Sequence, residues 1–214
     1  MQELELAVLP YPEEIPEDWQ APPQYRFFVP DQLHVVMGAS GKPAQEVLSA
    51  PLLREGIPLY KRRGGGGTVL LGPHCVVLTV HARVAHLYHN LRYFSAINRA
   101  LMTCLEPMLD CSLEERGISD IACAGKKIVG SSIFRRKYFL LYQASILIDL
   151  PIETIQRVLA HPPKEPDYRQ NRSHRDFLTC LKTLGYSGSA TQCAETLQAA
   201  FGSVLPKQLE LADV

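Results

Sequence analysis

Apolar and polar residues alternate with two different periods along this chain, and the period distinguishes expected strands from expected helices. The segments "YRFFVPDQLHVVMGAS", "CVVLTVHARV" and "YFLLYQASILIDL" are rich in β-branched and aromatic residues, which is typical of strands. The last of these is almost continuously apolar and ends before Pro151, as expected of a strand that is buried on both faces. The segment "SDIACAGKKIVGSS" predicts two shorter strands that turn at Ala124-Gly125.

Helical spacing replaces this pattern between Tyr88 and Met108. Apolar residues recur there every three or four positions, which predicts one long amphipathic helix. The residues of its apolar face are Leu91, Phe94, Ile97, Leu101, Cys104, Leu105 and Met108.

Shorter helices are predicted before and after this region. "PAQEVLSAPLLREG" suits a helix that Gly56 ends, and three more are expected in "IETIQRVLA", "SHRDFLTCLKTLG" and "SATQCAETLQAAFG". Ser173 is the expected N-cap of the segment "SHRDFLTCLKTLG", with Asp176 three residues later and Gly185 at the end. Hairpins and helices in mixed order predict the α+β class, with a mixed or antiparallel sheet and packed helices.

Composition narrows the possible partners and the number of domains. The chain has 214 residues, 46% of them hydrophobic, and 22 basic residues balance 22 acidic ones. We expect a Pro-rich and Glu-rich arm over residues 1–25 and one domain over residues 26–214. The balanced charge argues against a broad surface for nucleic acid or for an anionic membrane, although a local basic pocket is compatible with it.

The N-terminal sequence and the cysteines predict a cytoplasmic protein. Acidic residues stand where a signal peptide carries basic ones, and the longest apolar run is too short to cross a bilayer. The cysteines are scattered and form no CxxC pair, so neither a zinc ribbon nor a disulfide framework is expected. They are Cys75, Cys104, Cys111, Cys123, Cys180 and Cys193.

The most distinctive stretch is "YKRRGGGGTVLL", from Tyr60 to Leu71. Consecutive glycines allow backbone N–H groups to converge on one point, and the preceding arginines bring planar donors that suit phosphate or carboxylate. The alternative is a flexible surface loop between two strands. The pattern is not a Walker A loop, which needs GxxxxGK followed by Ser or Thr. It is not a dinucleotide-binding GxGxxG motif either, because Val69 stands where the third glycine would be.

A second cluster, "GKKIVGSS" from Gly125 to Ser132, places lysines, a glycine and two hydroxyls in one hairpin. It suits contact with a reactive carbonyl or a phosphate, and its alternative is a solvated basic turn. His81, His86 and His89 have no carboxylate or cysteine at a recognisable metal-ligand spacing, so we expect no metal site there.

Taken in order, these motifs resemble the lipoate–protein ligase family and its octanoyltransferase relatives. The resemblance rests on "HVVMGASGKPAQEV", "RRGGGGTV", "SDIACAGKKIVGSS" and "QASILIDL", together with "PPKEPDYRQNRSHRDF". It implies the fold of the class II biotin/lipoate ligase catalytic domain. It also implies ATP-dependent activation of lipoate or octanoate to acyl-AMP, and transfer to a lysine of a lipoyl carrier. Such a carrier would be a glycine cleavage H-protein-like protein or a dehydrogenase E2 lipoyl domain.

The resemblance also assigns roles to individual residues. Lys127 is matched to the lysine that contacts the acyl carbonyl and the phosphate, and Asp120 to an acid near the nucleotide and its Mg²⁺. The residues that the resemblance places around the substrate or adenylate are Arg63, Gly64, Gly65, Gly66, Gly67, Thr68, Val69, Asp120, Gly130, Ser131 and Ser145.

The chain departs from the family pattern at several positions, which leaves two alternatives open. Gly64 stands where a serine is frequent, Leu71 replaces a histidine, and Gln143 begins a Gln-Ala-Ser sequence in place of His-Gly-Thr or His-Gly-Ser. One alternative is an octanoyltransferase that carries the acyl group on Cys111. The other is a non-catalytic protein that kept the binding pocket.

Overall fold

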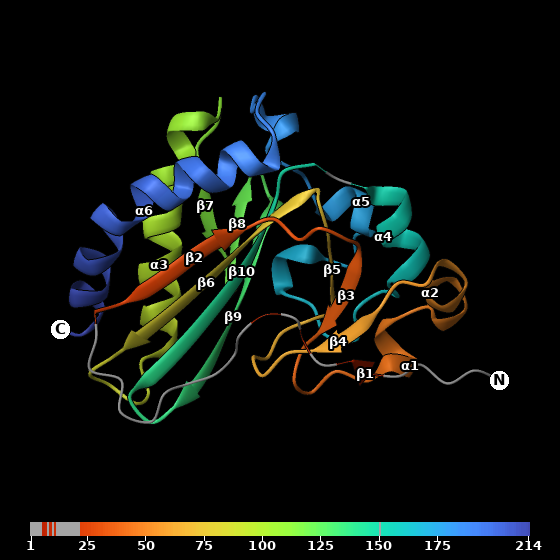
Figure 1. Cartoon of the computed structure of the whole chain (residues 1–214), viewed down its shortest axis with the longest axis horizontal. Helices are drawn as coiled ribbons and strands as arrows, with labels where there is room; N and C mark the ends of the chain where they lie inside the picture. The colour runs from red at the N-terminus through yellow and green to blue at the C-terminus, as the bar shows by residue number, and fades with distance from the viewer. Residues whose placement is uncertain (1–5, 8, 10, 12–21, 150) are drawn as a thin grey trace.

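The strands form two sheets of different size (Figure 1). The computed structural model describes residues 6–7, 9, 11, 22–149 and 151–214. In this part of the chain the larger sheet has six strands, each antiparallel to its neighbours. Their order across the sheet is β2 (Gln24–Phe28), β6 (Cys75–Arg83), β10 (Phe139–Leu147), β9 (Lys126–Arg136), β8 (Asp120–Cys123) and β7 (Glu114–Arg116).

The smaller sheet is mixed. Its central pair, β3 with β4, is parallel, as is β1 with β4, whereas β5 runs antiparallel to β3. Its order is β1 (Leu6–Ala7), β4 (Leu59–Lys61), β3 (His34–Met37) and β5 (Val69–Leu71). The two sheets and the helices around them confirm the predicted α+β class.

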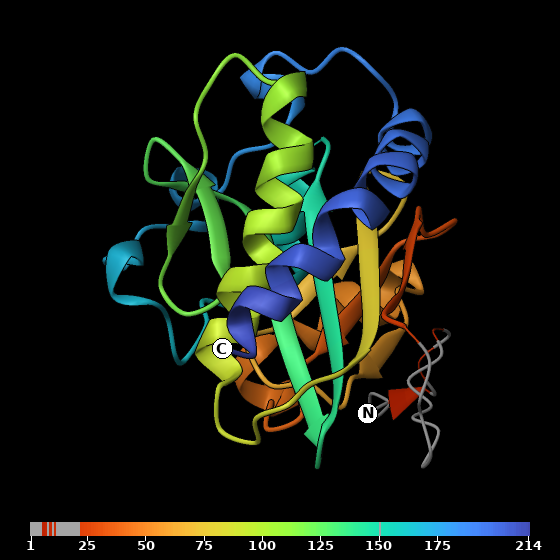
Figure 2. The same ribbon diagram turned by 90° about the vertical axis from the view of Figure 1, so that its left-hand side faces the viewer.

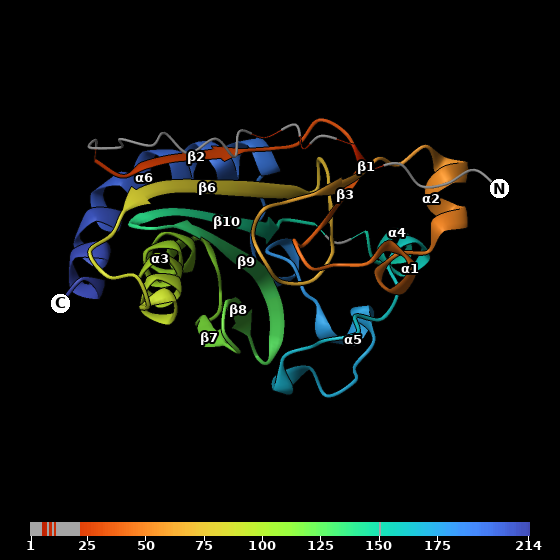
Figure 3. The ribbon, with the colours of Figure 1, turned by 90° about the horizontal axis from the view of Figure 1, so that it is seen from below.

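Two long helices cover one face of the larger sheet. They are α3 (Asn90–Leu105) and α6 (Ala190–Ala212), which pack against each other and cross in front of the strands (Figure 2). The remaining α-helices lie at the opposite end of the molecule, beside the smaller sheet (Figure 3). They are α1 (Pro43–Glu46), α2 (Ser49–Glu55), α4 (Ile152–Val158) and α5 (His174–Phe177). Single 3₁₀ turns are η1 (Glu106–Met108), η2 (Asp167–Arg169) and η3 (Lys182–Leu184).

Strand β6 is buried on both faces, which accounts for its nearly continuous apolar sequence. Val76, Leu78 and Val80 belong to the main core, which the helices α3 and α6 complete. Val77, between them, belongs to a small third core that it shares with residues of the smaller sheet. Because side chains alternate along a strand, one strand supplies both cores. This places the smaller sheet against the face that the helices leave uncovered.

The predicted helix between Tyr88 and Met108 is confirmed as α3 followed by η1, with one correction to its apolar face. Leu91 was expected on that face, but its side chain is 65% exposed. Tyr93, also in the first turn, is fully buried instead.

Two other predicted helices are interrupted, and the same physical cause applies to both. The helix expected in "PAQEVLSAPLLREG" is split into α1 and α2 by Val47, which forms an isolated β-bridge with Leu159. The helix expected between Ser173 and Gly185 ends at Phe177, because the next residue forms a bridge with Lys127. In both places, pairing with a distant segment overrides local helix propensity.

The caps of these segments were predicted correctly, while the last helix was predicted too short. Ser173 caps α5 and accepts a hydrogen bond from the backbone N–H of Asp176. Gly56 and Gly185 end α2 and η3 with left-handed backbone. Helix α6 continues past Gly202 to Ala212, although it contains a proline.

Most of the expected N-terminal arm, residues 1–5, 8, 10 and 12–21, lies outside the described residues. Within the arm, Leu6–Ala7 forms β1, and Gln24 begins β2 two residues before the expected boundary at residue 26. Of the helices in the described part of the chain, none combines the length and the apolar character needed to cross a membrane.

Candidate active site

A cavity of about 1100 Å³ is lined by residues of both sheets and by the segment that follows α4. We call residues 160–178 the covering segment, because they line the cavity beside β8 and β9. The volume is at the upper end of the range usual for small-molecule sites. Such a cavity has room for a ligand larger than a single nucleotide base or fatty acid.

One row of cross-strand neighbours forms the floor of the cavity. Val77 pairs with Ser145, Ser145 with Gly130, and Gly130 with Asp120, and all four residues line the cavity. Neighbouring strands lie about 4.8 Å apart, so the row spans about 14 Å from its apolar end at Val77 to its acidic end at Asp120. The floor therefore changes from apolar to charged along its length.

Lys127 reaches this row because β9 contains a β-bulge. Asp120 pairs with Gly130, but Ala122, two residues further along β8, pairs with Lys127, whereas a regular ladder would place Ile128 there. Cross-strand partners share a face of the sheet, and so do residues two apart on β8. Lys127 therefore lies on the cavity face together with Gly130. Bulges commonly re-aim a side chain in this way.

The Lys127 ammonium is partly exposed and forms an ion pair with the buried Asp120 at the charged end of the cavity. Its Nζ lies 2.8 Å from Oδ1 of Asp120, and Oδ2 of Asp120 accepts a hydrogen bond of 2.9 Å from the hydroxyl of Tyr168. Burial and the adjacent carboxylate raise the pKa of Tyr168, so this hydroxyl remains a neutral donor. An ammonium has three N–H groups, so Lys127 can keep Asp120 and still donate to a ligand.

Gly130 makes room for the lysine. A Cβ at this position would lie only 2.6 Å from Nζ and 2.7 Å from Cε of Lys127. The neighbouring Lys126 is exposed and does not line the cavity.

The glycine run forms a loop between β4 and β5 of the smaller sheet. Gly66 has left-handed backbone with φ of +87°, and a Cβ there would lie 3.1 Å from Nη2 of Arg62. Arg62 folds the loop, because its guanidinium donates to the carbonyl oxygens of Gly65, Gly67 and Val36.

Of the two arginines before the glycines, only the first lines the cavity. Arg62 lines the cavity, whereas Arg63, which the resemblance placed at the ligand, lies over the ring of Phe134 at 5.7 Å and is not among the lining residues. Thr68 lines the cavity and donates to Glu46, a second lining residue that the sequence did not single out.

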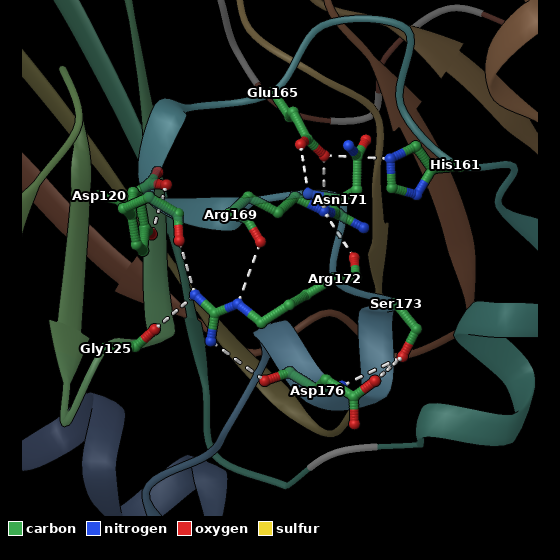
Figure 4. A network of polar contacts seen from close by, with 10 residues as sticks. Asp120, Gly125, His161, Glu165, Arg169, Asn171, Arg172, Ser173 and Asp176 are labelled. Atoms are coloured by element: carbon green, nitrogen blue, oxygen red, sulfur yellow. Dashed lines mark hydrogen bonds and ion pairs between the residues drawn. The ribbon is translucent and has the colours of Figure 1, made fainter.

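The covering segment is held in place mainly by Arg172 (Figure 4). Its guanidinium donates to four backbone carbonyl oxygens: those of Gly125 at 3.0 Å, Tyr168 at 2.7 Å, Arg169 at 3.0 Å and Asp176 at 3.5 Å. Gly125 is the turn between β8 and β9, so this arginine ties the segment to the hairpin that carries Lys127. Hydrogen bonds from a charged group contribute more than neutral ones, about 1.5–3 kcal/mol each.

Glu165 provides the second fixed point of the segment (Figure 4). Its carboxylate accepts from the backbone N–H of Asn171 at 2.7 Å and lies 3.0 Å from Nε2 of His161. It also forms an ion pair with Nε of Arg169 at 3.3 Å.

Arg169 is the most unusual side chain of the segment. It is only 5% exposed, lines the cavity and lies over the ring of Phe177 at 4.7 Å. Its Nη2 is buried and has no hydrogen-bond partner among the described residues. Burial lowers the pKa of its guanidinium, although it remains far above neutrality. A buried, unsatisfied cationic donor is the kind of group that an anionic ligand satisfies.

The opposite end of the cavity is apolar. Val36, Leu71 and Val77 are buried there and belong to the third core. Leu71 is the residue that replaces a histidine of the family pattern, so this departure makes the apolar end more apolar. The other lining residues of that core are Leu9, Tyr11 and Val69.

The cysteines are not among the residues that line the cavity. All six are described and none lines it. Cys111 is half-buried beside Cys123, and burial, followed by a hydrogen bond with that thiol, raises the pKa of Cys111 to about 12. The charges of Asp110 and Glu106 also contribute to this rise. A thiol in this environment is protonated at neutral pH, which is unfavourable for a nucleophile.

The sequence-predicted residues therefore divide into two groups. Those that line the cavity are Gly66, Gly67, Thr68, Val69, Asp120, Lys127, Gly130, Ser131 and Ser145. Those that do not are Arg63, Gly64, Gly65 and Cys111. Five lining residues were not predicted from the sequence: Arg62, Glu46, Tyr168, Arg169 and Tyr11. Two of them, Tyr168 and Arg169, lie in the stretch "PDYRQNR", which is part of the resemblance. Among the described residues no three side chains of His, Cys, Asp or Glu gather to hold a metal.

A fold with these two sheets and this cavity defines an α+β domain with a site for a small-molecule ligand. Among curated proteins, octanoyltransferase LipM of Kyrpidia tusciae is 33% identical over 92 residues, which make up 42% of this chain and 34% of that protein. The match thus covers about a third of the length of that relative. Residues 13–202 match the family of the lipoyl protein ligase A/B catalytic domain. The chain belongs to this family.

Solved structures show the same fold at low sequence identity. A structure from the bipartite lipoate protein ligase system of Thermoplasma acidophilum, which includes an E2 lipoyl domain, has a TM-score of 0.75 and 21% identity. It covers 91% of this chain and 79% of its own. Lipoate-protein ligase A bound with ATP has a TM-score of 0.73 and 21% identity, and the match covers 90% of this chain and 81% of that one. LipL1 of P. falciparum in complex with lipoate has a TM-score of 0.68 and 18% identity, and the match covers 88% of this chain and 50% of that one.

Proposed function

We propose that this chain activates lipoate or octanoate with ATP and transfers the acyl group to a lysine of a lipoyl carrier domain. The observation that carries the proposal is the position of Lys127. Its ammonium lies at the charged end of a cavity whose other end is apolar. An acyl-adenylate has the same polarity, with an apolar chain, a carbonyl and a phosphate in sequence.

In the first reaction, a carboxylate oxygen of the acid attacks the α-phosphorus of ATP, and the bond to pyrophosphate breaks. Lys127 donates to the oxygens on which negative charge develops, while Asp120 holds its ammonium in place. Arg169 offers its unpartnered Nη2 to the phosphate from the covering segment. The products of this reaction are acyl-AMP and pyrophosphate.

In the second reaction, the neutral amine of the carrier lysine attacks the acyl carbonyl, and AMP leaves. Lys127 again stabilises the charge on the carbonyl oxygen. The covering segment shields the cavity from water, which would otherwise hydrolyse the adenylate.

The site suits Mg²⁺ only as a companion of the nucleotide. Magnesium in nucleotide sites is usually held by one or two carboxylates together with phosphate oxygens. Asp120 is the carboxylate at the charged end, and both of its oxygens already accept hydrogen bonds or an ion pair. Each carboxylate oxygen has a second lone pair, so Asp120 could contact the ion and keep its contacts with Tyr168 and Lys127.

The experiment combines the protein with ATP, Mg²⁺, lipoate or octanoate, and an isolated E2 lipoyl domain. We expect the intact mass of the carrier to rise by one acyl group, only when ATP is present. A carrier acylated equally well from an acyl-carrier thioester without ATP would contradict the proposal. Binding of acyl-AMP without any transfer would favour the non-catalytic alternative.

The second candidate function is an octanoyltransferase, which the similarity to LipM favours. In that reaction a cysteine thiolate takes the acyl group from a carrier thioester and later passes it to the carrier amine. Cys111 lies outside the cavity and carries a raised pKa, which speaks against this role.

We therefore predict that Cys111→Ser leaves ATP-dependent acylation within about twofold of wild type, the effect usual for a change outside the site. The measurement is the initial rate of carrier acylation by mass spectrometry. An acyl group trapped on Cys111 of the wild type in the absence of ATP would reverse the assignment.

A further inference from the structure

Leu9 and Tyr11 lie at the apolar end of the cavity, and we call these two residues the N-terminal wall. Leu6 and Ala7 form β1, which pairs with Leu59 and Tyr60 of the smaller sheet. Leu9 and Tyr11 both line the cavity. The described residues near the N-terminus therefore do two things. Leu6 and Ala7 pair with the smaller sheet, and Leu9 and Tyr11 contribute side chains to the cavity.

Tyr11 is fixed by specific contacts. Its hydroxyl is hydrogen-bonded to Nε2 of His34, and its ring lies 4.8 Å from that of Phe28. His34 is 3% exposed, and burial lowers its pKa, so the imidazole is neutral. Its Nδ1 lies 2.9 Å from the carbonyl oxygen of Gln32 and donates to it, which leaves Nε2 as the acceptor for the tyrosine.

The Tyr11 ring lies at the end of the cavity opposite to Asp120 and Lys127. Tyr11 packs against the third core, which contains Val77. Val77 begins the cross-strand row that ends at Asp120, about 14 Å away at the usual strand spacing. A chain that extends from Lys127 along this row therefore meets the ring of Tyr11 at its far end.

We propose that Tyr11, supported by Leu9, closes the apolar end of the cavity and sets the longest acyl chain that the protein accepts. The inference rests on the proposed function, because it assumes that the apolar end receives the acyl chain. It assigns a role in chain-length specificity to an N-terminal segment that the sequence pattern marked only as an arm.

Tyr60 offers a matched control. Its ring lies 5.5 Å from that of His34, the same separation as the ring of Tyr11, but it does not line the cavity. Tyr60→Ala thus removes an aromatic ring from the same histidine without opening the cavity. Tyr11→Phe removes only the hydroxyl and keeps the ring.

The test measures binding of hexanoate, octanoate, decanoate and dodecanoate by calorimetry, without ATP. The proteins compared are the wild type and the variants Tyr11→Ala, Tyr11→Phe and Tyr60→Ala. We expect affinity in the wild type to stop rising beyond octanoate. In Tyr11→Ala it should continue to rise, by up to about fourfold for each methylene that becomes buried. Tyr11→Phe and Tyr60→Ala should keep the wild-type profile, and thermal unfolding checks that all variants are folded.

Two results would overturn the inference, and they are distinct from a failure of the proposed function. If Tyr11→Ala keeps the wild-type profile, or if Tyr60→Ala shifts it equally, Tyr11 is not the wall. If the wild type binds none of these acids, the proposed acyl substrate is wrong, and the inference fails with it.

Discussion

At the scale of single residues, Gly66 is more constrained than its neighbour Gly65. Gly66 has φ of +87° and lies against the guanidinium of Arg62, which folds the loop through Gly65 and Gly67. Gly65 has no heavy atom within 4 Å of the place where a Cβ would be.

We therefore predict that Gly66→Ala weakens binding of acyl-AMP by about tenfold, since a side chain with positive φ costs roughly 1–2 kcal/mol and disturbs the loop. Gly65→Ala should change binding by no more than about twofold. Both affinities are measured by calorimetry with a non-hydrolysable acyl-adenylate analogue. Equal effects of the two variants would mean that the loop is only a connector.

The same residues show what could be predicted from the sequence at this scale. The glycines and the arginines were recognised as a candidate ligand loop. The assignment of Arg63 to the ligand stays a prediction, although Arg62 is the arginine that lines the cavity. Adjacent side chains of an extended segment point in opposite directions, and local sequence does not say which one faces the cavity. The role of Lys127 came from the resemblance and stays a prediction, whereas the physical reason for its position, the bulge in β9, depends on pairing with β8.

At the scale of elements, Arg172 is a side chain that ties the covering segment to the β8–β9 turn. Arg172 donates to carbonyl oxygens of the segment and of the β8–β9 turn. Arg175, three residues later, forms an ion pair with Glu153 in which both side chains are more than half exposed. Exposed pairs of this kind contribute about 0–1 kcal/mol.

We predict that Arg172→Met increases hydrogen exchange of the covering segment by at least about tenfold, because it removes several charge-assisted bonds. Arg175→Met should leave exchange there unchanged within about twofold to threefold. Mass-spectrometric hydrogen exchange on the free protein measures both. If the two variants behave alike, Arg172 does not hold the segment.

Elements with a strong local pattern were predicted well, and those shaped by distant pairing were not. The helix α3 and the turn at Ala124-Gly125 follow from spacing and turn residues within one segment. The breaks at Val47 and Leu178 follow from β-bridges to Leu159 and Lys127, which no local pattern reveals.

At the scale of the whole molecule, the candidate site exists because two sheets meet. Val77 belongs to the larger sheet and Val36 to the smaller one, and they share a core that opens into the cavity. The α+β class was predictable from the order of the elements. The cavity was not, since it depends on how segments distant in sequence approach one another.

The central claim of the account is that Lys127 performs chemistry at the charged end of this cavity. Lys127→Met removes the ammonium and keeps a side chain of similar length. Its neighbour Lys126 is exposed and outside the cavity, so Lys126→Met is the matched control. Thermal unfolding of both variants checks that loss of the ion pair with Asp120 has not unfolded the protein.

The most direct measurement is pyrophosphate exchange into ATP that depends on lipoate or octanoate. A charged contact to the transition state contributes about 3 kcal/mol, so Lys127→Met should lower the exchange rate by about a hundredfold. Lys126→Met should stay within about twofold of the wild type. A Lys127→Met protein that is folded and exchanges at the wild-type rate would contradict the account.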